Sequence, residues 1–194
     1  MKGIVIYKSN YGATRQYAQW IGNDLNFAVV SASVVNTQRV KDADMVVIGS
    51  SIYMGKALIK GWLRRNKQLL AGKIIFIFLV SGTPVDHRNE LEKYTSASIP
   101  ASIRENIHLF FLPGKMIYQQ LSWLHRITLQ LGARLLAKNG QRNILQDYNE
   151  VRRNNITELV AAANAVILRG QEQPREPKGT RPFENYTEGG RMEG

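Results

Sequence analysis

The chain has 194 residues, no cysteine, three histidines and a formal net charge of +11 at pH 7. The lack of cysteine excludes disulfides, thiolate nucleophiles and cysteine-bound zinc or iron–sulfur sites, and three separated histidines argue against a histidine metal site. The positive charge indicates an anionic partner, such as nucleic acid, a lipid surface or an acidic small molecule, although a solvated basic face would explain it equally well. No signal peptide precedes the first strand pattern and no apolar run is long enough to span a bilayer, so we expect a cytoplasmic location.

Apolar strands alternate with helical segments along most of the chain. Strands are predicted over residues 2–7, 27–35, 45–48, 73–80 and 107–112. Helices are predicted over 13–25, 57–70, 86–97 and 150–168 from apolar residues at helical spacing. This pattern predicts an α/β fold, a right-handed, doubly wound, five-stranded parallel sheet.

Two segments do not belong to this minimal pattern. Residues 113–142 form a basic insertion after the fifth strand, and residues 170–194 are rich in Pro, Gly, Glu and Arg with little to bury. We therefore expect one domain over residues 1–169, which includes the insertion, followed by a disordered tail over 170–194.

The loop after the first strand has the residues of a phosphate site. It reads Ser9-Asn10-Tyr11-Gly12-Ala13-Thr14 and leads into a helix, whose first backbone N–H groups and dipole favour an anion. The Ser9 and Thr14 hydroxyls can add donors, and Gly12 allows close approach of a ligand. The loop is neither a Walker motif nor G-x-G-x-x-G. An ordinary strand-to-helix turn, capped by Ser or Asn, is the alternative.

Two further loops are predicted to lie at the same edge of the sheet. Ser50-Ser51-Ile52-Tyr53-Met54-Gly55 follows the third strand, and Ser81-Gly82-Thr83-Pro84 follows the fourth. In doubly wound sheets, ligands bind at the carboxyl ends of the strands, where the strand order switches. The three loops together favour a phosphate-bearing ligand.

These motifs resemble those of a known family. Residues 9–14 resemble the flavodoxin loop that cradles the phosphate of FMN. Residues 46–55, Val46-Val47-Ile48-Gly49-Ser50-Ser51-Ile52-Tyr53-Met54-Gly55, resemble the third-strand signature of the menaquinone-dependent protoporphyrinogen dehydrogenases and related flavodoxin-domain proteins. The helical insertion after Leu112-Pro113-Gly114-Lys115 is similar to the extra segment that separates that branch from electron-carrying flavodoxins. The resemblance covers residues 1–168.

The resemblance implies FMN as the cofactor and assigns its contacts. Residues 9–14 would hold the phosphate, residues 50–55 would wrap the flavin ring with Tyr53 or Met54 against it, and residues 81–83 would close the other edge. The implied cofactor-binding residues are Ser9, Asn10, Tyr11, Gly12, Ala13, Thr14, Ser50, Ser51, Ile52, Tyr53, Met54, Gly55, Ser81, Gly82 and Thr83. The fourth loop lacks the aromatic residue of many long flavodoxins, which argues against a ring held between two aromatics. No catalytic residue is assigned, because the redox chemistry would be the flavin's.

The insertion combines an apolar helical face with basic flanks. Residues 113–142 contain no acid and five basic residues, and the apolar positions of 118–138 recur at helical spacing. A helix over 118–138 is therefore expected to contact an anionic membrane surface or a lipid-borne quinone. Packing on the domain, or on a second copy in a homodimer, is the alternative.

Three functions remain open. The resemblance and the positive charge favour an FMN-dependent oxidoreductase of the protoporphyrinogen dehydrogenase type, with an anionic small-molecule substrate and a quinone acceptor at the inner face of the cell membrane. A flavodoxin-like electron carrier is the alternative, although such carriers are typically acidic. A nucleic-acid-binding module on a flavodoxin scaffold is disfavoured, because the chain has no nucleic-acid motif and its basic residues are scattered.

Overall fold

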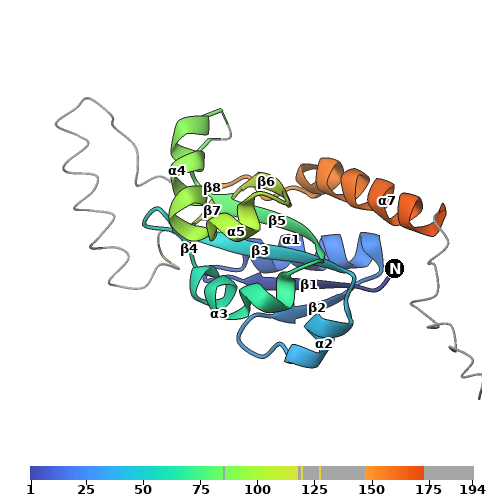
Figure 1. The fold of residues 1–194 in the computed structure, drawn as a ribbon. Coiled ribbons are helices and arrows are strands. Elements are labelled where there is room, and N and C mark those ends of the chain that lie inside the picture. The colour runs from blue at the N-terminus through green and yellow to red at the C-terminus, as the bar shows by residue number, and fades with distance from the viewer. Residues whose placement is uncertain (85, 118, 120–126, 128–146, 173–194) are drawn as a thin grey trace, which may run out of the picture.

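A parallel sheet forms the centre of the molecule (Figure 1). The computed structural model describes residues 1–84, 86–117, 119, 127 and 147–172. Within them, the parallel strands follow the order β2-β1-β3-β5-β6. The order in which successive strands are added to the sheet therefore reverses between β1 and β3. The strands are β1 (Gly3–Lys8), β2 (Ala28–Ser31), β3 (Met45–Tyr53), β5 (Ile74–Ser81) and β6 (Ile107–Pro113). This order confirms the predicted doubly wound fold.

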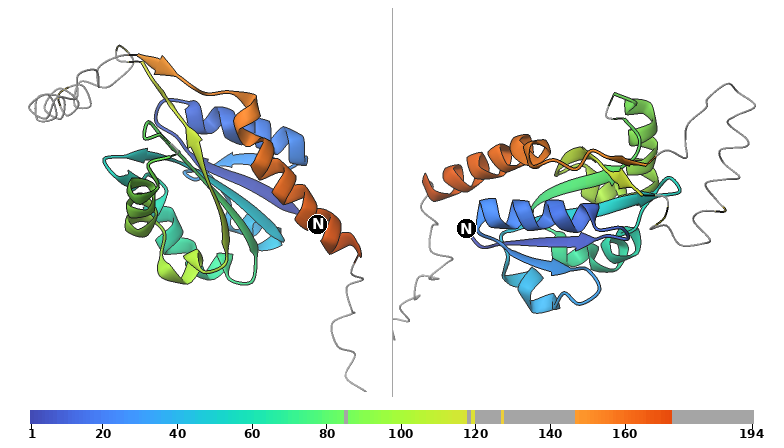
Figure 2. Two further views of the ribbon diagram at one scale, coloured as in Figure 1. Left: turned by 90° about the horizontal axis from the view of Figure 1, so that it is seen from above. Right: turned by 180° about the vertical axis from the view of Figure 1, so that it is seen from behind.

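Helices cover both faces of the sheet because the central strands are apolar on both sides. On one face, α1 (Ala13–Leu25) and α7 (Thr157–Glu172) pack over strand residues such as Val5, Val47 and Phe76. On the other, α2 (Thr37–Asp42), α3 (Lys60–Leu70) and α5 (Ala101–Arg104) cover residues such as Ile6 and Ile48. Figure 2 shows these two layers on either side of the sheet. α4 (Arg88–Ser98) contacts the short strand β4 (Lys56–Ala57).

Two small antiparallel ladders extend the carboxyl-end edge of the sheet. β4 pairs with the end of β3, so the two form a hairpin. β7 (Lys115–Met116) pairs with β8 (Tyr148–Asn149), and a 3-10 helix, η2 (Arg153–Ile156), leads from β8 to α7. The second ladder therefore holds the two ends of the segment between Met116 and Tyr148 side by side.

Several predicted boundaries were wrong, for identifiable reasons. β2 ends at Ser31 rather than at residue 35, because β1 ends beside it and the chain turns, leaving Val34 76% exposed. Residues 49–53, predicted as loop, continue β3 because β5 pairs with residues 49–51 and β4 pairs with residues 52 and 53. The helix predicted from residue 57 begins at Lys60, since Ala57 is held in β4 and its N–H donates to Ser98 Oγ at 2.7 Å.

The C-terminal predictions also need adjustment. The final helix was predicted from residue 150, but Glu150 is extended and its N–H donates to Gly114 O at 3.1 Å, so α7 starts at Thr157 after η2. α7 continues to Glu172, three residues beyond the predicted domain boundary. The predicted insertion helix over 118–138 and the tail from 173 onward lie outside the described residues, apart from residues 119 and 127. No helix in the described part of the chain is long and apolar enough to cross a membrane.

Candidate functional site

The loop between β1 and α1 ends in a left-handed glycine. Gly12 has φ 83° and ψ −16°, its N–H donates to Ser9 Oγ at 3.1 Å, and its carbonyl accepts from Gln16 N at 2.9 Å. Among the described residues, no side chain caps the N-terminus of α1, and its first turn has no acidic residue. Within this part of the chain, the first N–H groups of the helix and the positive end of its dipole are thus available to an anion.

Two of the predicted site residues use their hydroxyls inside the protein. Thr14 is fully buried, and its Oγ1 lies 2.7 Å from Ser51 Oγ, which joins α1 to β3. Ser50 is also fully buried; its hydroxyl donates to Ser51 O and accepts from Ile59 N, each at 3.1 Å. Thr14 and Ser50 therefore stabilise the edge of the sheet by linking α1 and the start of α3 to β3.

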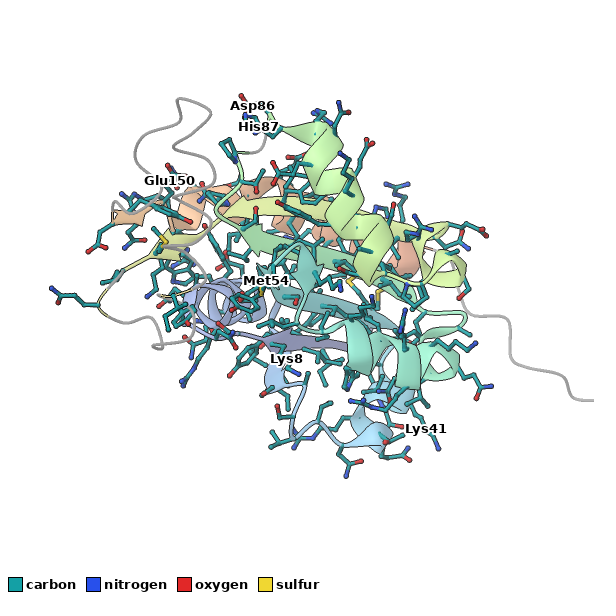
Figure 3. The ribbon with its side chains drawn as sticks, turned by 90° about the vertical axis from the view of Figure 1, so that its left-hand side faces the viewer. Lys8, Lys41, Met54, Asp86, His87 and Glu150 are labelled. Atoms are coloured by element: carbon teal, nitrogen blue, oxygen red, sulfur yellow. The ribbon has the colours of Figure 1, made fainter. Side chains whose placement is uncertain are left out.

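The β3–β4 hairpin places residues 52–55 at this edge. Met54 and Gly55 form its two-residue turn, with φ values of 47° and 72°. A turn with positive φ at both positions matches the twist of an antiparallel hairpin. Met54 is 68% exposed at the tip. Figure 3 looks onto this edge and shows Met54 between Lys8 at the end of β1 and the rim formed by Asp86 and His87.

The loop after β5 is flanked by two tyrosines from elsewhere in the chain. A Cβ built on Gly82 would lie 2.1 Å from Tyr148 Oη, so the phenol of β8 occupies the space beside this glycine. On the other side, Thr83 Oγ1 lies 3.2 Å from Tyr94 Oη, and the Tyr94 hydroxyl donates to Glu90. Aromatic side chains from β8 and α4 thus lie beside the fourth loop, which has no aromatic residue of its own.

These two phenols keep their protons. Burial raises the pKa of Tyr148, and the nearby Glu150 raises it further. Burial also raises the pKa of Tyr94, with a contribution from its hydrogen bond to Glu90. Both side chains therefore present neutral hydroxyl groups beside the fourth loop at physiological pH.

A lysine that the sequence presented only as part of the basic insertion belongs to this site. Lys115 Nζ lies 3.9 Å from the position that a Cβ would take on Gly12. No local signal could have revealed this proximity, because Lys115 follows the fifth parallel strand and reaches the first loop only through the sheet order.

The donor set at the first loop fits the phosphate of FMN. It consists of helix N–H groups, the Ser9 hydroxyl and the Lys115 ammonium. Apart from Gly12 and its two chain neighbours, no other described residue places an atom within 4 Å of the Cβ position on Gly12. The hairpin and the fourth loop lie on the same edge, where a flavin ring would extend from that phosphate. Among the described residues, no group of three or more His, Asp or Glu side chains could hold a metal ion.

Several solved structures are similar to this chain. The structure resembles a flavodoxin from the domain Archaea, which is 24% identical, covers 73% of this chain and 100% of its own, and gives a TM-score of 0.42. It also resembles Smu.1420 from Streptococcus mutans UA159 (14% identical, 72% and 100% covered, TM-score 0.45) and the two-electron reduced flavodoxin of Megasphaera elsdenii (15% identical, 56% and 85% covered, TM-score 0.40). No curated protein sequence gives a significant match.

A family model of the flavodoxin domain matches residues 4–143. The match runs from β1 past the end of β6 and includes the phosphate loop, the hairpin and the loop after β5. The chain therefore belongs to the flavodoxin domain family, with FMN as its cofactor.

Proposed function

We propose that this protein is an FMN-dependent oxidoreductase of the protoporphyrinogen dehydrogenase type. It takes hydrogen from an anionic porphyrinogen and passes the electrons to a quinone. Membership of the flavodoxin domain family supports the general part of this proposal, FMN-dependent electron transfer or oxidoreduction. FMN, when bound, supplies the redox chemistry, and the chain supplies binding, orientation and exclusion of water.

The observation that carries the proposal is the position of the β7–β8 ladder. Gly114 N donates to Ser81 O at 2.8 Å, which ties the start of β7 to the loop after β5. Lys115 pairs with Asn149 and Met116 with Tyr148, so both ends of the inserted segment lie at the cofactor edge. An electron carrier needs only an accessible flavin edge. An additional segment anchored beside that edge is what an enzyme needs to hold a substrate or acceptor there.

Charge supports an anionic substrate. The chain carries 26 Lys and Arg residues against 15 Asp and Glu residues, and residues 113–142 contain no acid. A porphyrinogen carries carboxylates, which such a surface attracts. A quinone resides in the lipid, and a basic segment near the flavin would bring the protein to an anionic membrane surface. We accordingly propose a peripheral association with the membrane, in preference to pairing of the insertion with a second copy.

The deciding experiment is an anaerobic assay of the FMN-loaded full chain with protoporphyrinogen and a menaquinone analogue. Each pair of hydrogens removed from the substrate reduces one quinone to its quinol, so the quinone is the oxidant. We expect porphyrin fluorescence to rise with protein concentration and to require both FMN and the quinone. A rate equal to that without protein would reject the dehydrogenase and leave an electron carrier, which reduction and reoxidation of the bound flavin by a redox protein would then test.

A further inference from the structure

We propose that Lys115 binds the phosphate of FMN, so that the strand opening the insertion is itself part of the cofactor site. The inference rests on the assignment of FMN as cofactor, and it adds a cationic ligand to the loop formed by residues 9–14. It does not depend on which substrate the flavin oxidises.

The geometry places the ammonium over the phosphate loop. Gly12 is the N-terminal cap of α1, and the direction that a Cβ on Gly12 would take leads to Lys115 Nζ at 3.9 Å. Apart from Gly12 and its two chain neighbours, no other described residue places an atom within 4 Å of that point. A phosphate seated on the N–H groups of α1 would therefore have the ammonium as its neighbour on the Gly12 side.

The fold holds the backbone of Lys115 in place from three directions. Gly114 N donates to Ser81 O at 2.8 Å, and Gly114 O accepts from Glu150 N at 3.1 Å. Tyr17, on the same helix that offers its N-terminus to the phosphate, donates its hydroxyl to Pro113 O at 2.9 Å. The lysine and the helix N-terminus are thus fixed relative to each other, and their distance does not depend on the rest of the insertion.

The charge of Lys115 is not neutralised within the described part of the chain, where no ion pair joins it to a carboxylate. A phosphate monoester carries close to two negative charges at neutral pH, whereas a helix N-terminus offers only about half a positive charge. An ammonium beside it makes a charge-assisted hydrogen bond, which is stronger than those of the N–H groups alone. Lys115 therefore compensates charge that the loop cannot compensate by itself.

Titration of the cofactor-free full chain with FMN and with riboflavin, followed by flavin fluorescence, tests this role. Riboflavin has the same ring and ribityl chain without the phosphate. Lys115→Ala should weaken FMN binding about 10- to 100-fold and leave riboflavin binding unchanged. Lys115→Arg should retain most of the FMN affinity. The matched control is Lys67→Ala, which removes the same charge from an exposed position of α3.

The salt dependence gives a second readout. Removing a phosphate-bound cation should make the FMN dissociation constant less sensitive to salt, whereas Lys67→Ala should leave that sensitivity unchanged. Equal FMN affinity in Lys115→Ala and wild type would overturn the inference, and so would an equal loss of FMN and riboflavin, which would mean a structural role. Wild-type protein that binds neither flavin would refute the cofactor assignment itself. A flavin-loaded protein that fails to oxidise porphyrinogen would refute only the enzymatic proposal.

Discussion

Among single residues, Gly12 and Gly72 show why the same backbone conformation has different consequences at two places. Both are left-handed, with φ values of 83° and 71°. Gly12 caps α1 at the carboxyl-end edge, whereas Gly72 lies in the turn before β5 at the opposite edge. Apart from its chain neighbours, no described residue places an atom within 4 Å of the Cβ position on Gly72. Glycine at each position avoids the strain that a side chain imposes on this conformation.

Gly12→Val is expected to abolish FMN retention. The branched side chain strains the left-handed turn by about 1–3 kcal/mol and fills the space between the loop and Lys115. Gly72→Val imposes comparable strain away from the site, so it should lower the melting temperature and leave FMN binding intact. Flavin titration and thermal unfolding of both variants make the comparison. Loss of FMN in both variants, or in neither, would contradict a specific role of Gly12 in the phosphate loop.

Gly82 is expected to tolerate no side chain while Tyr148 keeps its hydroxyl. A Cβ on Gly82 would lie 2.1 Å from Tyr148 Oη and 3.2 Å from Cζ. Gly82→Ala should therefore destabilise the protein by about 1–3 kcal/mol, as overpacking does. Combining it with Tyr148→Phe removes the closest atom and should recover part of the loss in a denaturant titration. Strictly additive effects of the two substitutions would show that the contact is absent in solution.

Ionisation of three tyrosines should lower the free energy of unfolding at alkaline pH. Burial is the main cause that raises the pKa of Tyr17, Tyr94 and Tyr148 above the ordinary value of 10.0. The folded protein then holds these protons more tightly than the unfolded chain. Their contribution to stability is complete below about pH 10 and is lost as the pH rises through the folded-state values. Unfolding free energies measured from about pH 9 to about pH 11 should decline less steeply in Tyr94→Phe and in Tyr148→Phe than in wild type; identical slopes would refute the linkage.

At the scale of helices and strands, the accuracy of the sequence-based interpretation depends on where each element finds its partners. The runs at 45–48 and 74–79 are apolar on both faces, so their burial between two helix layers follows from their own residues. β2 was drawn too long because β-branched residues favour a strand, whereas the actual length is limited by β1 beside it. The sequence-based interpretation missed α2, although the sequence contains an N-cap residue for it. Asn36 is this N-cap, and its Oδ1 accepts a hydrogen bond from Gln38 N at 2.7 Å.

In the candidate site, too, features that depend on neighbouring residues in the sequence could be predicted, whereas features that depend on distant parts of the chain could not. The loop of residues 9–14 could be singled out because its residues are consecutive and its helix follows immediately, while its contact with the FMN phosphate stays a prediction. Lys115 and Tyr148 could not be placed beside Gly12 and Gly82, because only the sheet order and the β7–β8 pairing bring them there. The hydroxyl of Thr14 was expected at the phosphate, but a residue type cannot reveal that Ser51 lies 2.7 Å away as an alternative partner.

At the scale of the whole molecule, the basic residues of the insertion lead us to expect association with an anionic membrane, which can be tested by reversing their charge. Changing Arg126, Arg134 and Lys138, which lie outside the described residues, to Glu should abolish co-sedimentation with anionic liposomes, since each basic residue near such a surface contributes roughly 1 kcal/mol. FMN content and melting temperature should hold. The matched control changes three exposed basic residues of α3, Arg64, Arg65 and Lys67, to Glu.

Equal loss in both triple variants would indicate attraction by net charge alone, without a role of the insertion. Wild-type protein that never sediments with these liposomes at low salt would reject the membrane proposal. Gel filtration would then test self-association through the insertion, which predicts a dimer that the insertion variant disrupts and the α3 variant does not.

The phenol of Tyr17 has a consequence for how this fold can be varied. It donates to Pro113 O at 2.9 Å and accepts from Asn155 Nδ2 at 2.7 Å, so a single side chain of α1 holds the chain on both sides of the segment that joins β7 to β8. With both ends fixed, the entropy of closing the intervening segment changes only slowly with its length. Residues 117–147 are therefore expected to tolerate shortening, lengthening or exchange with little change in the stability of the flavodoxin domain.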